Sequence, residues 1–359
     1  MTTVQPPLVP AGRRARGALA RDAGSRRAVR RTVLLVLVGL VVVGVAGVAG
    51  LAFGSHQIDP ADVVAAFVAY DPTNSDHVVV RQSRVPRVAL GLVVGAALGV
   101  AGMLMQSITR NPIADPGLLG VNAGAAAGIV IAIAYLGVVT PLGYVWFAFA
   151  GAAVAAVLVF VVGSARRSAA TPARMALAGA ALTMAISAVT GMVLVSNEPA
   201  FLRFRYWSVG TLQGRGTDVL AAVLPFVLAG LLLAAGLTRV LNTLALGDDS
   251  ARGLGVHATR ARIGSAVAVV LLAGAATAAA GPIGFIGLTV PHVARGITGP
   301  DQRWVLPYSM VLAPILLLSA DIVGRVIARP GEIEVGIVTA FIGAPVFILL
   351  AGRRRIAAL

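Results

Sequence analysis

The cysteine and lysine side chains that many enzymes use as nucleophiles or phosphate grips do not occur in this sequence. Cysteine is absent, and all 29 residues counted as lysine or arginine are arginine. The chain therefore has no disulfide, thiolate metal site, cysteine nucleophile or iron–sulfur cluster. It also has neither the phosphate-binding lysine of a P-loop nor a lysine for a Schiff base. If ATP drives this protein, a partner must hydrolyse it.

Two carboxylates stand close to long apolar runs, where an ionisable group is a candidate proton relay. Asp115 follows Arg110, and Asp321 precedes Arg325. Arginines this close favour structural ion pairs over relays. Neither a nucleophile–base pattern nor a carboxylate dyad occurs, and the histidines lack the paired spacing of metal ligands. We therefore predict no catalytic residue, no metal site and no cofactor bound by this chain. The four histidines are His56, His77, His257 and His292.

The polar connector 241–255 reads LNTLALGDDSARGLG and is the most informative segment between apolar runs. Asp248 or Asp249 can cap a helix N-terminus, and Gly253 and Gly255 can end it. We expect one or two helical turns there. The pattern leaves open whether they form a partner-binding helix or an ordinary connector. The candidate residues are Leu246, Gly247, Asp248, Asp249, Ala251, Arg252, Leu254 and Gly255.

A second group of candidates consists of arginines expected outside the cell, against the usual cytoplasmic bias of arginine. Their side chains either snorkel at the interface or dock an acidic partner. They are Arg81, Arg84, Arg87, Arg325 and Arg329. A third candidate is the polar stripe of Thr183, Ser187 and Thr190, which share one face of a helix. These hydroxyls either line a wet path or bond their own helix backbone.

The elements that position these residues follow from composition. Of the 359 residues, 58% are apolar and 12% are charged, and the mean hydropathy is +0.91. Soluble domains carry about 25% charged residues. We therefore predict an all-α polytopic membrane protein, since a membrane-spanning helix needs about 20 apolar residues. The ten predicted spans cover about 32–53, 85–106, 118–136, 142–162, 175–195, 217–237, 263–280, a short helix after 287, 304–324 and 335–351.

The distribution of arginine sets the expected orientation. Arginines crowd 13–31 and 353–355, next to the first and last spans, so both termini are expected in the cytoplasm. Residues 1–31 form an Arg-rich tail, 32–352 one transmembrane domain, and 353–359 a basic end. We therefore interpret the net charge of +15 as a signal that orients the chain in the membrane, rather than as a sign of nucleic-acid binding. A twin-Arg export signal is the competing interpretation of the start, but the first apolar run is long and many spans follow.

Glycines indicate where helices approach closely or break. Two ladders with four-residue spacing, 91–95–99 and 120–124–128, are expected to serve helix packing alone. The segment Gly281–Gly287 is expected to break helix order inside the bundle. Residues Arg239–Arg262 are expected to form the largest internal loop, and the segment that holds Arg203 and Arg205 is expected to lie outside.

Several motifs in fixed order make the sequence resemble the FecCD family of ABC-importer permeases, from the first span onward. A lone motif of this kind would be weak, but the order of all of them is specific. Glu334 stands where the family often has proline, which affects only the start of the last helix. The matching stretches are RVPR at 84–87, GAAL at 95–98, Gln106 with RNPIADP at 110–116 and LG at 119–120, WSVG at 207–210, LG at 246–247 with LGV at 254–256, GPIGFIGL at 281–288, PHVAR at 291–295, AD at 320–321 and GAPVF at 343–347.

The resemblance implies a ten-helix permease of the BtuC-like, type II importer fold in a bacterial plasma membrane. It implies pairing with a second permease subunit, docking of two ATPase subunits that bind ATP and Mg²⁺, and an external substrate-binding protein. The 248–255 loop would then contact the ATPase, and Arg84, Arg87 and Arg325 would meet the binding protein. Candidates for the path and its inner gate are Thr171, Thr183, Ser187 and Thr190.

Within this resemblance, ferric siderophore is the expected substrate, with cobalamin or haem as alternatives. The alternative from another class is a proton-driven secondary transporter that uses Asp115 or Asp321. It predicts transport without an ATPase.

Overall fold

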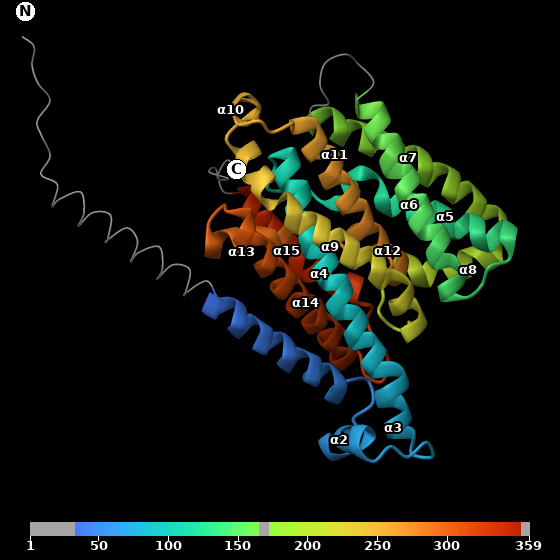
Figure 1. The fold of residues 1–359 in the computed structure, drawn as a ribbon. Helices are drawn as coiled ribbons and strands as arrows, with labels where there is room; N and C mark the ends of the chain where they lie inside the picture. Colours follow the sequence, from blue (N-terminus) through green and yellow to red (C-terminus); the bar gives the residue numbers. More distant parts are fainter. Residues whose placement is uncertain (1–32, 165–171, 353–359) are drawn as a thin grey trace, which may run out of the picture.

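The computed structural model describes residues 33–164 and 172–352, and every regular element in these two ranges is helical (Figure 1). An N-terminal helix, Val33–Ala52, precedes the labelled elements. These are α2 (Pro60–Val68), α3 (Ser75–Val79), η1 (Val80–Arg84), α4 (Val85–Thr109), η2 (Pro116–Leu119), α5 (Val121–Leu136), α6 (Pro141–Ser164), α7 (Pro172–Ser196), α8 (Glu198–Ser208), α9 (Thr217–Ala245), α10 (Asp248–Gly253), α11 (Ala258–Val269), η3 (Val270–Gly274), α12 (Ala275–Ala280), α13 (Ile286–Thr298), α14 (Gln302–Ile327) and α15 (Val335–Gly352).

Among the described residues, seven helices are long and apolar enough to cross a membrane. They are Val33–Ala52, Ser75–Thr109, Pro141–Gly163, Arg174–Ser196, Thr217–Ala245, Ala258–Ala280 and Gln302–Ile327. The other three predicted spans correspond to the shorter helices α5, α13 and α15. The prediction of an all-α multi-pass membrane protein is thus confirmed.

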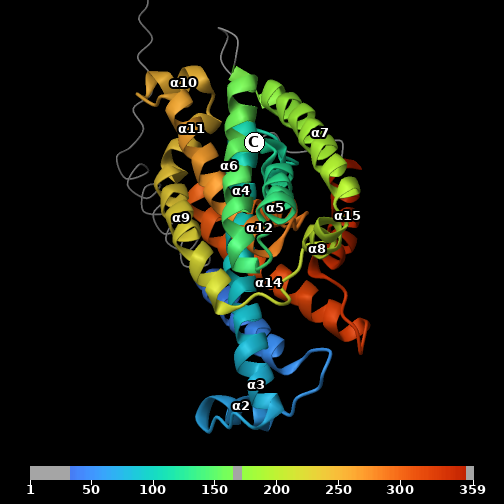
Figure 2. The ribbon, with the colours of Figure 1, turned by 90° about the vertical axis from the view of Figure 1, so that its right-hand side faces the viewer.

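The bundle has two distinct ends. Figure 1 shows α10 and the start of α11 at one end, and α2 and α3 at the opposite end. Figure 2, turned by 90°, shows the same separation, with α4 running between the two ends through the middle of the molecule. We refer to them as the α10 end and the α2–α3 end.

Helix α4 is the centre of the bundle because its small residues let other helices come close. It packs against α14, α13, α9 and α11. A Cβ atom on Gly95 would lie 2.7 Å from the Cα atom of Pro314 in α14. In the second ladder, Gly124 and Gly128 meet the backbone of α6 at Gly151 and Phe147. Both ladders serve packing, as predicted.

The expected break after residue 280 is also confirmed. Helix α12 ends at Ala280, and α13 begins at Ile286. Gly281 has φ 79°, a value that favours glycine, and its backbone lies against the carbonyl group of Trp207. Phe285 adopts φ 68° before α13. Gly281 and Ile283 are buried within the protein, whereas Gly284 is exposed, so the start of the turn lies where irregular backbone is tolerated at membrane depth.

The predicted internal loop is largely helical. Helix α9 continues to Ala245, so the loop predicted from Arg239 is shorter, and α10 and α11 occupy most of the rest. That prediction was wrong because hydropathy shows where apolar residues end, whereas a helix continues while its polar residues still favour helical backbone. The segment with Arg203 and Arg205 forms α8, whose N-cap Asn197 accepts a hydrogen bond from the backbone N–H of Ala200.

Candidate functional site

Helix α10 is a short helix held on the bundle at a single buried point. Ala251 is fully buried, and the backbone N–H groups of Leu254 and Val256 donate to the Ala251 carbonyl oxygen at 3.2 and 2.9 Å. Gly247 precedes the helix with φ 105°, which favours glycine. The expectation of one or two helical turns is confirmed. Ala251 faces the bundle, so it supports α10 from beneath.

Two leucines at either side of α10 point away from the bundle. Leu246 is 67% exposed and Leu254 is 66% exposed. Between them, the Asp249 side chain is 97% exposed and pairs loosely with Arg252 at 3.4 Å. Exposed leucines beside charged residues suit contact with another protein.

Asp248 does not cap α10, which corrects the capping prediction. Its carboxylate accepts hydrogen bonds from Arg110 at 2.6 Å and from Arg262 at 2.9 and 3.1 Å. Arg110 also donates to the carbonyl oxygen of Leu244 at 2.7 Å. Burial opposes ionisation of Asp248, but the charges and hydrogen bonds of Arg262 and then Arg110 outweigh it and lower its pKa. This cluster joins the ends of α4, α9 and α11 to α10.

The expected pair between Arg110 and Asp115 does not form. Asp115 instead accepts a hydrogen bond from the backbone N–H of Gly117 at 2.8 Å and caps η2. Arg110 ends α4 in the left-handed conformation, with φ 48°, so the chain reverses between the two residues. The Arg110 guanidinium contacts Asp248 instead. Two residues close in sequence can have side chains that point apart when the chain turns between them.

At the α2–α3 end, Arg84, Arg87 and Arg325 are buried rather than presented to solvent. Their exposed fractions are 5%, 6% and 2%. Arg87 pairs with Asp321 at 2.8 Å and with Glu332 at 2.7 Å, and Arg325 pairs with Asp321 at 3.1 Å. The pair predicted between Asp321 and Arg325 is confirmed.

Backbone carbonyl groups complete this buried cluster. Arg84 donates to the carbonyl oxygens of Leu51 and Ala52 at 2.6 and 2.8 Å, and Arg325 donates to that of Gly50 at 3.1 Å. The arginines therefore fasten the end of the Val33–Ala52 helix to α4 and α14. A partner carboxylate would have to compete with Asp321 and Glu332 to reach Arg87.

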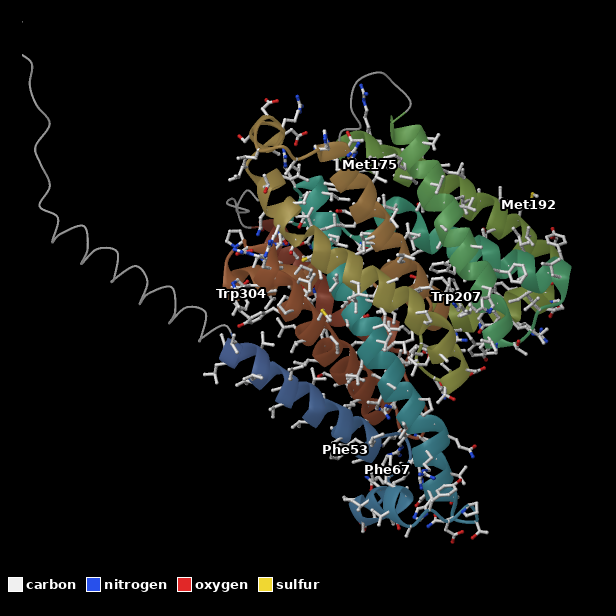
Figure 3. The ribbon with its side chains drawn as sticks, viewed as in Figure 1. Phe53, Phe67, Met175, Met192, Trp207 and Trp304 are labelled. Atoms are coloured by element: carbon white, nitrogen blue, oxygen red, sulfur yellow. The ribbon has the colours of Figure 1, made fainter. Side chains whose placement is uncertain are left out.

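The three residues of the polar stripe on α7 differ in how exposed they are. Thr190 is buried and donates to the carbonyl oxygen of Ile186 at 2.8 Å, so it bonds its own helix. Thr183 is half-buried, whereas Ser187 is exposed on a helix that also exposes Met184. Figure 3 shows Met175 near the α10 end of this helix and Met192 toward its other end. Thr171, the other gate candidate, lies outside the described residues.

One polar pair was not singled out from the sequence. Gln106 in α4 is fully buried and donates to the carbonyl oxygens of Gly287 and Leu288 at 3.2 and 3.0 Å, while Arg295 of α13 donates to its Oε1 atom. The pair ties α4 to α13 beside the break. Both residues stand in motifs of the family resemblance, which was the signal available.

Comparison with known proteins places these features in a family. The model of the FecCD transport family matches residues 30–353. The ferric enterobactin transport system permease protein FepD of Escherichia coli (strain K12) is 45% identical over 296 residues, which cover 82% of this chain and 88% of FepD. The probable siderophore transport system permease protein YfiZ of Bacillus subtilis (strain 168) is 42% identical over 305 residues, or 85% of this chain and 91% of YfiZ.

A solved structure shares the fold. An inward-facing conformation of a putative metal-chelate type ABC transporter matches with a TM-score of 0.78 and 26% identity, covering 88% of this chain and 98% of that chain. The family match spans all ten helices predicted to cross the membrane, together with α10 and the buried arginine cluster. The chain therefore belongs to the FecCD transport family of ABC-importer permeases.

Proposed function

We propose that this chain is the permease subunit of an ABC importer for a ferric siderophore in a bacterial plasma membrane. The observation that carries the substrate class is the 45% identity to FepD over most of both chains. YfiZ, whose name also specifies a siderophore system, supports it at 42% identity. Cobalamin is the second candidate, because the cobalamin import permease BtuC of Halobacterium salinarum (strain ATCC 700922 / JCM 11081 / NRC-1) is 40% identical over 82% of this chain and 79% of BtuC.

An importer of this kind works with ATPase and substrate-binding partners. In the proposed assembly, two permease subunits pair around the path, and two ATPases bind ATP and Mg²⁺ at the α10 end. The α10 end faces the cytoplasm, with both termini on that side. The arginines in 13–31 and 353–355 support this orientation, since cytoplasmic segments next to spans are rich in arginine.

The coupling surface is the exposed part of α10. Leu246 and Leu254 make the apolar contact with the ATPase, while Asp249 and Arg252 surround it with charge. Ala251 supports α10 on the bundle, and Asp248 joins it to α4 and α11 through Arg110 and Arg262. A movement of α10 is thus passed directly to two membrane helices. ATP shifts the permease between two arrangements only by its different affinity for them.

The external binding protein docks at the α2–α3 end. Docking through Arg84, Arg87 and Arg325 remains a prediction with a condition attached. These guanidinium groups already bind Asp321, Glu332 and backbone carbonyl groups, so an acidic partner must exchange with them or act through their field. Thr183 and Ser187 on α7 remain candidates for the path between the paired permeases.

The test is reconstitution with the neighbouring gene products. A tag on this chain should retain an ATPase in detergent, and liposomes that contain the complex should take up an iron-55-labelled siderophore only with ATP. The matched variants are Leu254→Asp on the exposed part of α10 and Val68→Asp in α2, outside the membrane-spanning helices, where Val68 is 83% exposed. Loss of ATPase binding in Leu254→Asp alone is the expected result.

Uptake that needs a proton gradient but no ATPase would overturn this function in favour of a secondary transporter. Neutralising variants at Asp115 and Asp321 then separate the two mechanisms, because a relay would lose proton coupling. In the proposed importer, Asp321→Asn acts on stability, since the carboxylate lies between Arg87 and Arg325.

A further inference from the structure

An apolar groove opens between α6 and α11. It has a volume of about 300 Å³, and its side chains are hydrocarbon throughout. Helix α6 also packs on η3 and α12. Figure 2 shows α6 beside α11 below the α10 end. The lining includes Ala153, Ala156 and Phe160 of α6, and Ile263, Ala266 and Val270 of α11 and η3.

A polar cleft continues the groove along the same face of α11. Its lining consists of one acidic residue and six others: Asp248, Arg252, His257, Ala258, Thr259, Arg260 and Arg262. Thr259 lies four residues before Ile263, so both project from one side of the helix. The cleft therefore lies at the end of the groove nearest α10.

The arginines of this cleft differ in what they bind. Arg262 pairs with Asp248, which also binds Arg110 from outside the cleft, and Arg252 pairs with Asp249. Arg260 is exposed, and among the described residues it has neither a hydrogen-bond nor an ion-pair partner. The cleft thus has positive charge left over for an anion, beside a groove that accepts only hydrocarbon.

The length of this surface matches one leaflet. With a rise of about 1.5 Å per residue, Ile263 to Leu271 spans about 12 Å, and Arg260 lies about 5 Å further on. The hydrocarbon core of a bilayer is about 30 Å thick, so one leaflet contributes about 15 Å. A molecule that fills both parts needs an anionic head and one or two hydrocarbon tails of about this length.

We propose that the α6–α11 groove and the adjoining cleft bind an anionic phospholipid, with its phosphate at Arg260 and an acyl chain against Ala153 and Ala266. An acyl chain brings no hydrogen-bonding group into a groove that offers none. A phosphate satisfies the free guanidinium with charge-assisted hydrogen bonds. The lipid joins α6 to α11 next to α10. Its placement in the cytoplasmic leaflet rests on the proposed function, whereas its binding does not.

The experiment uses the full chain, purified with its co-expressed partners and exchanged into nanodiscs of phosphatidylglycerol and phosphatidylcholine in equal amounts. Native mass spectrometry after release into detergent counts the lipids retained. Arg260→Ala removes the phosphate contact. Its control is Arg239→Ala, which removes an exposed arginine of α9. Ala266→Phe fills the groove, and Ala229→Phe adds the same ring to an exposed position of α9.

The wild-type chain should retain phosphatidylglycerol in preference to phosphatidylcholine. Arg260→Ala should lower that retention about fivefold, the factor that corresponds to about 1 kcal/mol for one arginine at an anionic leaflet. Ala266→Phe should lower it too, whereas Arg239→Ala and Ala229→Phe should retain it. Gel filtration checks that all four variants stay monodisperse.

Equal retention of the two lipids, or wild-type retention in both Arg260→Ala and Ala266→Phe, would overturn the proposal. If Arg260→Ala released the ATPase but kept the lipid, the cleft would be an ATPase contact, and the proposal would also fail. Lipid retention is counted without ATP or transport. The result therefore does not depend on whether the chain acts as an importer, and the two proposals can fail separately.

Discussion

Arg87 and Asp321, 234 residues apart in sequence, form a buried ion pair with the guanidinium Nη2 atom 2.8 Å from a carboxylate oxygen. The pair joins α4 to α14 at the α2–α3 end. Arg325 binds the other carboxylate oxygen, so one aspartate neutralises parts of two arginines. Buried charges persist only when they are paired in this way.

Replacing Asp321 with asparagine should therefore destabilise the protein strongly. The change leaves Arg87 and Arg325 short of a counter-charge, a loss that costs about 3–5 kcal/mol at buried sites. Thermal unfolding in detergent should shift to clearly lower temperature. Asp249→Asn is the matched control, because the Asp249 side chain is 97% exposed. Equal unfolding temperatures for the two variants would show that the buried pair contributes little.

Asp248 should make the stability of the α10 region depend on pH. Its pKa lies below the ordinary value of about 3.9, because Arg262 and Arg110 outweigh the effect of burial. A lowered pKa stabilises the folded state above the unfolded-state pKa, and this stability is lost as pH falls through the folded-state value. The wild type should be more stable than Asp248→Asn at pH 7, and the difference should shrink as the pH falls through the lowered pKa of Asp248. Melting curves at several pH values measure it, and a constant difference would contradict it.

The exposed leucines of α10 should matter for the ATPase and little for the fold. Leu246→Asp should weaken ATPase binding about tenfold, which equals about 1.4 kcal/mol and is typical of an important interface residue. Ala251→Asp should instead lower thermal stability, because Ala251 is fully buried. ATPase co-purification and melting temperature, measured on both variants, separate contact from support. Full ATPase binding by Leu246→Asp would remove that leucine from the interface.

Gly102 should tolerate no side chain. Its Cβ atom would overlap the backbone of Gly287 in α13, whereas a Cβ atom on Gly236 in α9 would meet nothing within 4 Å. Gly102→Ala should lose about 1–3 kcal/mol from overpacking. Gly236→Ala should gain about 0.5–1 kcal/mol from better helix propensity. Unfolding temperatures of the two variants test the contrast, and equal stability would mean that α4 and α13 separate easily.

Much of the fold followed from hydropathy. Ten apolar runs correspond to ten helices of the structure, and the break after Ala280 lies where Gly281 and Pro282 place it. The helical turns at Asp248–Gly253 were also predicted. These features depend on local chain properties: apolar length, glycine at a positive φ, and proline without an N–H. Helices α8 and the end of α9 were missed because polar residues that favour helix give no hydropathy signal.

The partners of the charged side chains, by contrast, were mostly not predicted from the sequence. Arg110 binds Asp248 rather than Asp115, and Arg84, Arg87 and Arg325 are buried although the sequence suggested external docking sites. The prediction that the glycine ladders serve helix packing was confirmed, since close packing depends on the small size of the residue alone. An ion pair depends on which helices become neighbours, which no local pattern specifies.

The sequence by itself determined that this protein spans a membrane many times, has no lysine for a P-loop and has the motif order of one permease family. The tertiary structure decided which charges are buried, which leucines of the α10 region are exposed and where a groove continues into a basic cleft. The reason is physical. Composition and periodicity are properties of neighbouring residues along the chain. A buried charge instead needs partners that can be hundreds of residues away in sequence, and only the packed bundle brings them within reach.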